Sequence, residues 1–277
     1  MSSYSVGIIG CGWLGKALLK QLQKNRHQVI ATFRSKENQK ELIELGAKTE
    51  LLSLPFSNQS EQHFESLDQD IIVISIPPRL RHSTDYPKHI KQLIDLAEQQ
   101  KVKHVILISS TAIYNGLSGE VDENSRLNFD GEKVVHLQQA EQYVAEFSKQ
   151  SSILRLAGLL GEDRHPSRFV KAGKVSDNSD NAVNLIHQTD VIGLILKIID
   201  TTKKSPFNSQ THIFNGVSDT HCSRQTFYET AAESRDLSKP SFSDKQTQMS
   251  RTVKSKQTRD LLGYTYQYDD LLNWLRA

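Results

Sequence analysis

A glycine-rich turn near the start of the chain carries the clearest chemical signature. Residues Gly10–Gly15 read Gly-Cys-Gly-Trp-Leu-Gly and directly follow an apolar run that ends at Ile9. In such a pattern the first glycine permits a tight turn, the second lets a pyrophosphate approach the backbone, and the third lets helix and strand pack closely. A helix that begins here also presents amide donors to phosphates. The predicted dinucleotide-binding residues are Gly10, Cys11, Gly12, Trp13, Leu14 and Gly15.

The residues after the second apolar run indicate which dinucleotide binds. NAD sites usually place an Asp or Glu about 20 residues after the glycines, where it accepts hydrogen bonds from the ribose hydroxyls. This chain has Arg34, Ser35 and Lys36 there. Arg34 can stack on the adenine and bind a 2′-phosphate, and Ser35 and Lys36 add a donor and a charge. We therefore expect NADP rather than NAD. In the alternative, Arg34 and Lys36 face solvent and Glu37 is a displaced NAD acid.

Alternating strands and helices position this turn. Short apolar runs and helix-spaced apolar residues follow one another for about 200 residues, which is typical of a doubly wound parallel sheet. The predicted strands are Tyr4–Ile9, Gln28–Phe33, Thr49–Leu52, Ile71–Ile76, Val105–Ile108, Ser152–Leu156 and His212–Phe214. The predicted helices are Leu14–Leu22, Lys36–Leu45, Tyr86–Glu98, Val134–Phe147 and Val191–Ile199. Polar loops are expected at Ser176–Asn181 and Lys239–Ser250.

The fold class that this order predicts is α/β, a Rossmann-like parallel sheet of about seven strands with a small C-terminal subdomain on the substrate side. We expect residues 1–160 to form the Rossmann core, completed by about 182–218. Residues 161–181 and 219–277 should then form the substrate-side subdomain. Ligands in open α/β sheets bind at the carboxyl ends of the strands, so both sites are expected there.

From the glycine turn onward the chain resembles the extended short-chain dehydrogenases/reductases, the family of nucleotide-sugar epimerases and dehydratases. The resemblance covers most of the chain. In its short length and in the form Gly-Cys-Gly-Trp-Leu-Gly, the chain is similar to an atypical subgroup described loosely as NAD-dependent epimerases/dehydratases. The matching segments, in order, are Gly10–Gly15, Val105–Tyr114, Val121–Ser125, Leu154–Gly161, Asn184–Asp190 and Leu261–Tyr264.

The resemblance implies a catalytic set of a Ser or Thr with a Tyr-x-x-x-Lys pair. Ser110 matches the Ser/Thr because it lies four residues before Tyr114. The family's Tyr and Lys places, counted back from Glu141, hold Lys133 and Leu137. A register shifted by one helical turn puts Phe129 and Lys133 there instead. Neither register supplies a Tyr, so the standard pair is missing.

Other residues are candidates to replace the missing tyrosine. Tyr114 matches a tyrosine that the family places beside the substrate, and it is a candidate proton donor. Lys133 and His136 lie at i and i+3 on one helix face, where either can act in acid–base chemistry. The alternative is that both are solvated surface residues. The candidate catalytic residues are Ser110, Tyr114 and Lys133.

Two basic segments and one acidic residue also allow two interpretations. Arg164 and His165, with Arg168 and Lys171, form a positive loop that suits an anionic or phosphorylated substrate, or simply faces solvent. Asp190 is expected to be structural, at the start of a helix, and His187 a partly buried histidine rather than a metal ligand. Four basic residues at helical spacing favour a solvent-facing helix, or contact a nucleotide diphosphate: Arg251, Lys254, Lys256 and Arg259.

The net charge, the length of the apolar runs and the cysteine content limit the class of protein. The net charge of +2 is too balanced to imply a nucleic-acid or membrane partner. No apolar run approaches a membrane span, and the first strand leaves no room for a signal peptide. The two cysteines, Cys11 and Cys222, are expected to be free thiols in the cytoplasm. No spacing of ligands predicts a metal site.

These observations leave three functional hypotheses. The first is an NADP-dependent oxidoreductase or epimerase for a small polar or sugar-like substrate, with a catalytic set that lacks the Tyr-Lys pair. The second is a non-catalytic NADP-binding redox sensor or regulatory protein. The third, a reductase with a helical second domain, is disfavoured by the segment Ser109–Tyr114. The expected partner is a small-molecule substrate, for which an anionic group is one option, and the family analogy allows a homodimer.

Overall fold

The computed structural model describes residues 3–56, 63–78, 84–169, 175–204 and 211–277, and the chain divides into two compact units. Each unit is built from three separate stretches of the chain. Unit 1 comprises Met1–Ser109, Val135–Leu154 and Ile198–Ile213. Unit 2 comprises Ser110–Val134, Arg155–Lys197 and Phe214–Ala277.

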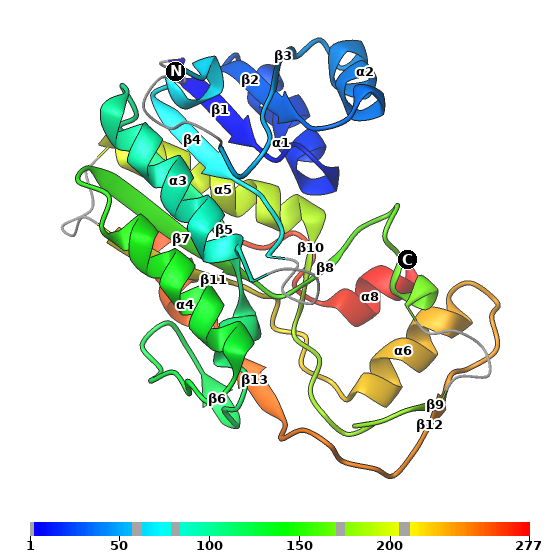
Figure 1. The fold of residues 1–277 in the computed structure, drawn as a ribbon. Helices are drawn as coiled ribbons and strands as arrows, with labels where there is room; N and C mark the ends of the chain where they lie inside the picture. The colour runs from blue at the N-terminus through cyan, green and yellow to red at the C-terminus, as the bar shows by residue number, and fades with distance from the viewer. Residues whose placement is uncertain (1–2, 57–62, 79–83, 170–174, 205–210) are drawn as a thin grey trace. The chain divides into compact units, whose positions relative to one another are not determined.

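Within the described residues, the main element is a seven-stranded parallel sheet of order β11-β7-β5-β4-β1-β2-β3. The chain starts at the centre with β1, moves outward to β3, and returns to build the other half (Figure 1). This reversal beside β1 is the topological switch point at which α/β sheets bind ligands. The strands are β1 (Ser5–Ile9), β2 (Gln28–Phe33), β3 (Lys48–Leu51), β4 (Ile71–Ile74), β5 (His104–Ser110), β7 (Gln150–Leu156) and β11 (Thr211–Gly216).

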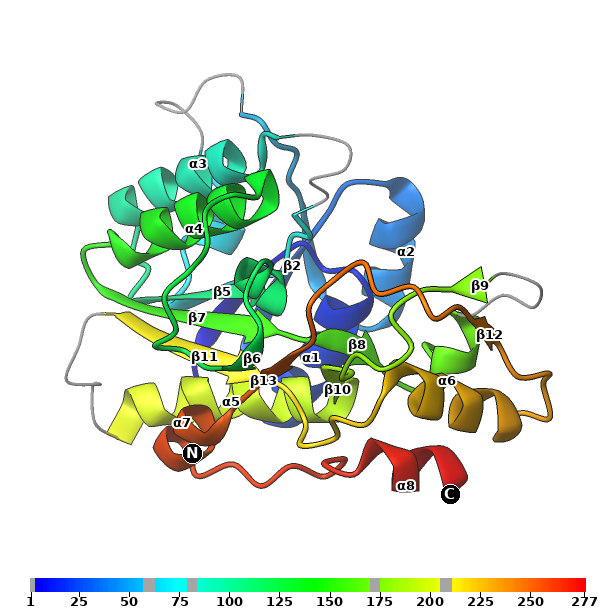
Figure 2. The ribbon, with the colours of Figure 1, turned by 90° about the horizontal axis from the view of Figure 1, so that it is seen from below.

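Helices cover both faces of this sheet. In unit 1, α3 and α4 lie on one face and α1 on the other (Figure 2). Right-handed crossovers require this change of face, because the chain runs in opposite directions across the sheet before and after β3. The helices are α1 (Trp13–Lys24), α2 (Lys36–Glu44), α3 (Tyr86–Gln99), α4 (Glu132–Ala145), α5 (Gln188–Lys204), α6 (Arg224–Glu233), α7 (Lys256–Leu262) and α8 (Leu271–Arg276).

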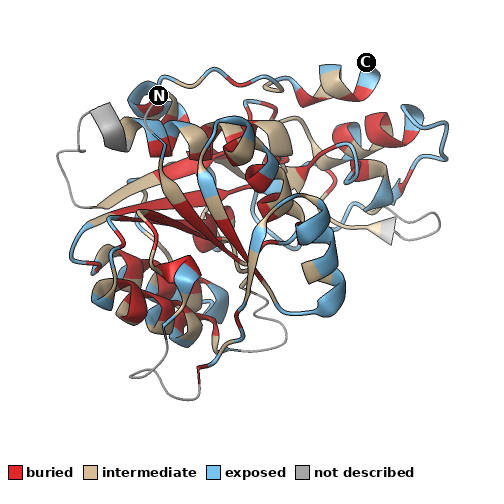
Figure 3. Ribbon diagram, turned by 90° about the horizontal axis from the view of Figure 1, so that it is seen from above, coloured by how far each residue is buried: buried red, intermediate tan, exposed pale blue. Residues whose placement is uncertain are grey.

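The hydrophobic core of unit 1 lies between the sheet and its helices. The central strands are buried along their length, and every residue of β4 is buried (Figure 3). Helix α1 contributes Leu14, Leu18 and Leu22, which recur every four residues and so share one face. Helix α2 buries only Leu42 and is otherwise mostly exposed. The predicted fold class is therefore confirmed, with β2 found at its predicted residues.

Unit 2 contains short paired strands and its own apolar cluster. The parallel pairs are β8 (Gly158–Leu160) with β10 (Leu185–His187), β6 (Gly119–Val121) with β13 (Arg251–Val253), and β9 (Val175–Ser176) with β12 (Ser241–Phe242). Ser176 of β9 and both residues of β12 lie in the two segments for which the sequence predicts polar loops. The cluster centres on α6 and α8, with Phe227, Leu271 and Leu275 buried in it.

Asp190 holds the C-terminal segment of unit 2 in place. Its buried carboxylate accepts hydrogen bonds from the Tyr264 hydroxyl at 3.0 Å and from the backbone N–H groups of Gln267 and Tyr268 at 2.6 and 3.0 Å. Gly193, one turn further along α5, leaves space for the Tyr264 ring, because a Cβ there would lie 2.1 Å from its hydroxyl. Helix α5 starts at Gln188, so Asp190 lies in its first turn and does not precede it.

Candidate functional site

The three glycines of the turn have three different environments. Gly10 has a φ of +91°, and a Cβ on it would lie 3.0 Å from the backbone oxygen of Ser75. A Cβ on Gly15 would lie 3.2 Å from the Cys11 sulfur and 3.3 Å from the Gly10 oxygen, so α1 packs tightly on β1 at that point. A Cβ on Gly12 would meet no atom within 4 Å. This open space at the second glycine is where a pyrophosphate would approach the backbone.

Side chains from β2 and α2 fix the turn in this shape. The Gly10 N–H donates to the hydroxyl of buried Thr32 at 2.9 Å, and the Asn38 side-chain amide donates to the Cys11 carbonyl at 3.3 Å. Neither residue was predicted from the sequence to shape the turn. Thr32 carried a usable signal, because a hydroxyl at the end of a buried strand needs a partner. Asn38 stands inside a polar helix and carried none.

The residues expected to select NADP lie at the carboxyl end of β2. Arg34, Ser35 and Lys36 are all exposed. Ser35 is the N-cap of α2, where its hydroxyl accepts from the Asn38 N–H at 3.2 Å. No ion pair of Arg34 or Lys36 is found among the described residues. Glu37 follows directly and is exposed in the first turn of α2, so the end of β2 presents two cations followed by one carboxylate.

Cys11 is a structural residue of the turn. It is 2% exposed, and burial raises the pKa of its thiol to about 12. The thiolate, which is the reactive form, is therefore scarce at neutral pH. This chemistry disfavours a redox sensor that operates through Cys11.

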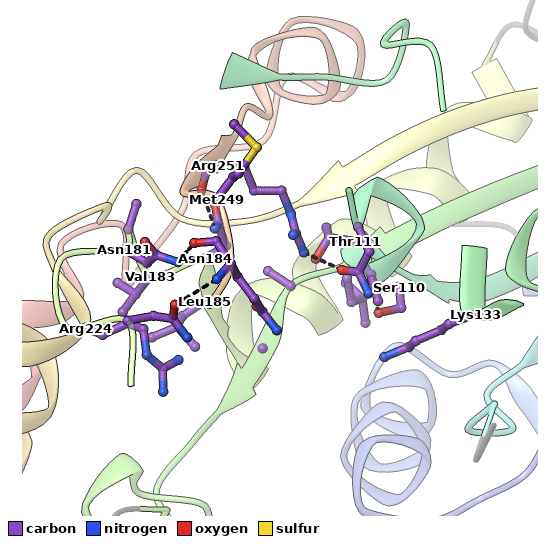
Figure 4. Close-up of a pocket in the computed structure, with 18 of the residues that line it drawn as sticks. Ser110, Thr111, Lys133, Asn181, Val183, Asn184, Leu185, Arg224, Met249 and Arg251 are labelled. Atoms are coloured by element: carbon purple, nitrogen blue, oxygen red, sulfur yellow. Dashed lines mark hydrogen bonds between the residues drawn. The ribbon is translucent and has the colours of Figure 1, made fainter. Parts of the chain in front are cut away.

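A pocket of about 390 Å³ lies within unit 2 and gathers residues from all three of its stretches. It begins at Ser110, the last residue of β5, and continues past Leu156, the last residue of β7 (Figure 4). Among its lining residues that the structure describes, none is acidic and three are basic: Lys133, Arg224 and Arg251. The pocket therefore has a positive lining at the strand ends, where ligands of α/β sheets bind.

Ser110 and Lys133, two of the three predicted catalytic residues, line this pocket together. The Ser110 hydroxyl accepts from the Ala112 N–H at 3.1 Å and so begins the short 3-10 helix Thr111–Tyr114. Lys133 lies in the first turn of α4, and its side chain extends toward the pocket (Figure 4). Lys133 stands in the family's Tyr place in one of the two registers given above and in its Lys place in the other.

Tyr114, the third predicted catalytic residue, does not line the pocket. It is 0% exposed, its hydroxyl donates to the Asn215 side chain at 2.9 Å, and it accepts from the Arg155 guanidinium at 2.8 Å. Burial raises the pKa of Tyr114, and the Arg155 charge opposes that rise. With both hydrogen-bond partners already supplied, Tyr114 acts as an anchor for the 3-10 helix that follows Ser110.

The remaining candidates lie outside the pocket. Leu137, in the family's Lys place, is a fully buried core residue of α4, and Phe129 is 54% exposed. Half-buried His136 does not line the pocket, and neither do the exposed residues Arg164 and Arg168. Lys171 lies outside the described residues. The anionic-substrate interpretation of the Arg164–Lys171 loop therefore finds no support in the pocket.

Arg251 requires a correction of the sequence analysis, and Arg224 an addition to it. Arg251 belongs to strand β13, not to a solvent-facing helix, and it is half-buried in the pocket. Helical spacing placed it wrongly because α7 starts only at Lys256. Arg224, the first residue of α6, was not identified. A lone arginine after a Ser N-cap is ordinary in a helix and gives no signal from sequence.

The polar amides of the pocket are structural. Asn178, whose φ is +61°, accepts from the backbone N–H groups of Thr247 and Gln248 at 2.7 and 3.0 Å. Asn181 donates to the Gln248 carbonyl at 3.0 Å, and Asn184 donates to the Arg251 carbonyl at 2.9 Å. These side chains hold the segment 246–251 along one wall of the pocket, and thereby set the position of Arg251.

No helix in the described residues is long and apolar enough to cross a membrane. No group of three or more His, Cys, Asp or Glu residues is arranged to hold a metal ion in the same part of the chain.

Comparison with known proteins agrees with this geometry. Residues 10–202 match the model of a family described as NAD(P)H-binding. Protein YeeZ of Escherichia coli K12 is 30% identical over 273 residues, which cover 96% of this chain and 97% of that protein. A conserved protein of unknown function from Silicibacter pomeroyi aligns with a TM-score of 0.78 at 19% identity, covering 99% of this chain and 98% of that one.

A second solved structure is a UDP-glucuronic acid 4-epimerase from Bacillus cereus in complex with NAD. It aligns with a TM-score of 0.76 at 17% identity, over 99% of this chain and 96% of that one. At this identity the likeness concerns the fold alone. Taken with the family match and the cofactor turn, it leads to one conclusion: the chain belongs to the NAD(P)H-binding family and has the fold of the NAD-dependent epimerases and dehydratases.

Proposed function

We propose that this protein is an NADP-dependent oxidoreductase, with epimerisation as a variant of the same chemistry, acting on a small polar or sugar-like substrate. The observation that carries the proposal is the pairing of Ser110 and Lys133 in one pocket at the end of β5. The glycine turn supports it from unit 1, because the space at Gly12 accepts a pyrophosphate. NADP is favoured by the exposed cations Arg34 and Lys36 at the end of β2.

The chemistry of the two pocket residues favours reduction of a carbonyl group. NADPH, when bound, supplies a hydride. An ammonium group offers three donors and no acceptor, so Lys133 can hydrogen-bond a carbonyl oxygen and stabilise the negative charge that develops on it. The Ser110 hydroxyl accepts from the Ala112 N–H, which leaves its own proton to donate to the same oxygen. Ser110 would thus orient the substrate, while Lys133 would donate the proton.

Replacing Arg34 by alanine tests the cofactor assignment. We expect the wild-type protein to bind NADPH more tightly than NADH, and Arg34→Ala to weaken NADPH binding by about 10- to 150-fold, or 1.5–3 kcal/mol, because a charge-assisted hydrogen bond is lost. NADH binding should change little. Nucleotide fluorescence measures both affinities. Exposed Lys24, outside the site in the last turn of α1, gives the control Lys24→Ala. Equal binding of the two nucleotides by the wild type would contradict the assignment.

The pairing of Ser110 and Lys133 is tested by turnover. A panel of small carbonyl compounds should include one that accelerates the loss of NADPH absorbance, and with it Ser110→Ala and Lys133→Met should each lower kcat by about 10²–10³-fold. His136→Ala, on the same helix but outside the pocket, should leave kcat unchanged. Tight NADPH binding with no turnover on any carbonyl compound would instead indicate a non-catalytic NADP-binding protein.

A further inference from the structure

Two arginines of the pocket lack the partners that half-buried cations normally have. Arg251 donates from one terminal nitrogen to the Asn115 side-chain oxygen at 2.9 Å, but its Nε atom is buried without a hydrogen-bond partner. The Nε atom of Arg224 is buried and without a partner too, and this guanidinium lies 5.5 Å from the centre of the Tyr228 ring. No salt bridge of either arginine is found in the part of the chain that the structure describes.

Such an arrangement is costly unless an anion completes it. A buried donor without a partner costs free energy, and the cost is larger when the group is charged. Burial lowers the pKa of Arg251, but a guanidinium stays protonated in proteins, so the charge cannot be removed by titration. Among the described lining residues there is no carboxylate that could neutralise it. Because guanidinium groups bind carboxylate and phosphate oxygens, an anionic ligand in the pocket would offset the charge of these two arginines.

We propose that the guanidinium groups of Arg224 and Arg251, on two sides of the pocket, form a cationic lining, the anion subsite, that attracts the phosphate or carboxylate group of a compact, non-nucleotide substrate. The proposal rests on the proposed function, because it names the class of substrate that the same pocket takes. Figure 4 shows Arg251 extending from its strand toward Thr111 and Ser110, with Arg224 on another side of the pocket beside Asn181.

The size and lining of the pocket favour a compact ligand. About 390 Å³ lies at the lower end of the roughly 300–1,000 Å³ that small-molecule sites occupy. Proteins commonly bind a nucleobase by stacking it on an aromatic ring. Among the described lining residues the aromatic one is Tyr228, and the Arg224 guanidinium already lies over its ring. The pocket thus offers sites for an anionic group but no free surface for a base.

The anion subsite is connected to the reacting end of the pocket. Asn115, which orients Arg251, directly follows the 3-10 helix that begins at Ser110. A second connection runs through Tyr114, which donates to Asn215, whose side chain in turn donates to the Lys254 carbonyl at 2.9 Å, just beyond β13. These contacts connect Arg251 and its strand to the segment that begins at Ser110. This connection would orient the rest of the substrate toward the carbonyl-binding residues.

Isothermal titration calorimetry with inorganic phosphate, glucose 6-phosphate, gluconate and UDP tests the proposal. The titrations are run with saturating NADP, so that phosphates of the cofactor already occupy the glycine turn, and are repeated without it. We expect Arg251→Gln and Arg224→Gln each to weaken the binding of inorganic phosphate by tenfold or more. The same loss is expected for whichever of glucose 6-phosphate and gluconate binds the wild type more tightly. The control Arg276→Gln removes an exposed arginine of α8 and should change nothing.

The outcomes separate this proposal from the cofactor assignment. Comparison of glucose 6-phosphate with gluconate shows whether phosphate or carboxylate is preferred. If UDP binds more than tenfold more tightly than glucose 6-phosphate and gluconate, with the same dependence on the two arginines, the compact substrate class is overturned. If all variants bind the anions equally, or if the wild type binds no anion, the subsite itself is overturned. If Arg251→Gln unfolds, Arg251→Lys keeps the charge and should still lose tenfold. NADPH fluorescence on the same variants reports the cofactor site separately.

Discussion

Replacing Gly12 by valine should abolish NADPH binding while leaving the protein folded. The added side chain would point into space where no protein atom lies within 4 Å, and the Gly12 φ of −87° is open to residues with a side chain. We therefore expect the unfolding free energy to fall by no more than about 1 kcal/mol, as for a β-branched residue at an N-cap. The same side chain would occupy the approach of the pyrophosphate. Affinity should drop at least 100-fold, about 2.8 kcal/mol.

A valine at Gly15 gives the matched contrast. There the Cβ would contact the Cys11 sulfur, the Gly10 oxygen and an Ile8 methyl group at 3.2–3.3 Å. We expect Gly15→Val to destabilise the fold by about 1–3 kcal/mol through overpacking, and so to lose binding and stability together. Thermal unfolding and NADPH fluorescence on the two variants check the contrast. Wild-type affinity in Gly12→Val would show that the pyrophosphate does not approach the backbone at that glycine.

Removing the Asp190 carboxylate should produce the largest loss of stability. Its 0% exposed oxygens accept three hydrogen bonds, two of them from backbone N–H groups near the C-terminus. Asp190→Ala would leave these donors without their partner, at a cost of about 1–3 kcal/mol for each one that stays buried. We expect unit 2 to lose about 3–5 kcal/mol. Urea unfolding, followed by tryptophan fluorescence of Trp274 in α8, measures the change.

The control for this experiment is Asp260→Ala. Asp260 is exposed on α7 and forms an i,i+4 ion pair with Lys256, so its loss should change stability by about 0.5 kcal/mol or less. Asp190→Asn keeps the shape of the side chain but replaces one accepting oxygen with a donor. Its loss of unfolding free energy should lie between those of Asp260→Ala and Asp190→Ala. A loss below 1 kcal/mol in Asp190→Ala would mean that water replaces the carboxylate and that the C-terminal segment is held by other contacts.

The sequence predicted the elements of the sheet well because their pattern is local. The strand Gln28–Phe33 is found at its predicted residues, since a buried parallel strand reads as an apolar run with polar ends. The glycine turn was predictable for the same reason, because its three glycines have distinct steric roles within a few residues. The short pairs β9–β12 and β6–β13 were not, because they join residues distant in the chain.

The pocket was predictable only in part. Ser110 and Lys133 were predicted from their spacing to Tyr114 and Glu141, and both line one pocket. Their chemical roles there stay predictions. Arg251 was predicted to lie on a helix because it continues the pattern of basic residues found in α7. That pattern does not show that the helix starts only at Lys256. Tyr114 was expected near the substrate because it matches a tyrosine that the resembling family places there. Burial beside Arg155 is a tertiary property that no local pattern records.

The division of the chain into interleaved stretches has a consequence for how the protein is made. The backbone crosses between the two units five times, so neither unit is a continuous piece that can mature by itself as the chain leaves the ribosome. The glycine turn emerges before Arg251 and the backbone donors at Gln267 and Tyr268. A nascent chain that ends before Arg251 therefore has the cofactor turn but lacks α8, and it exposes the apolar surface of α6 until α8 is made.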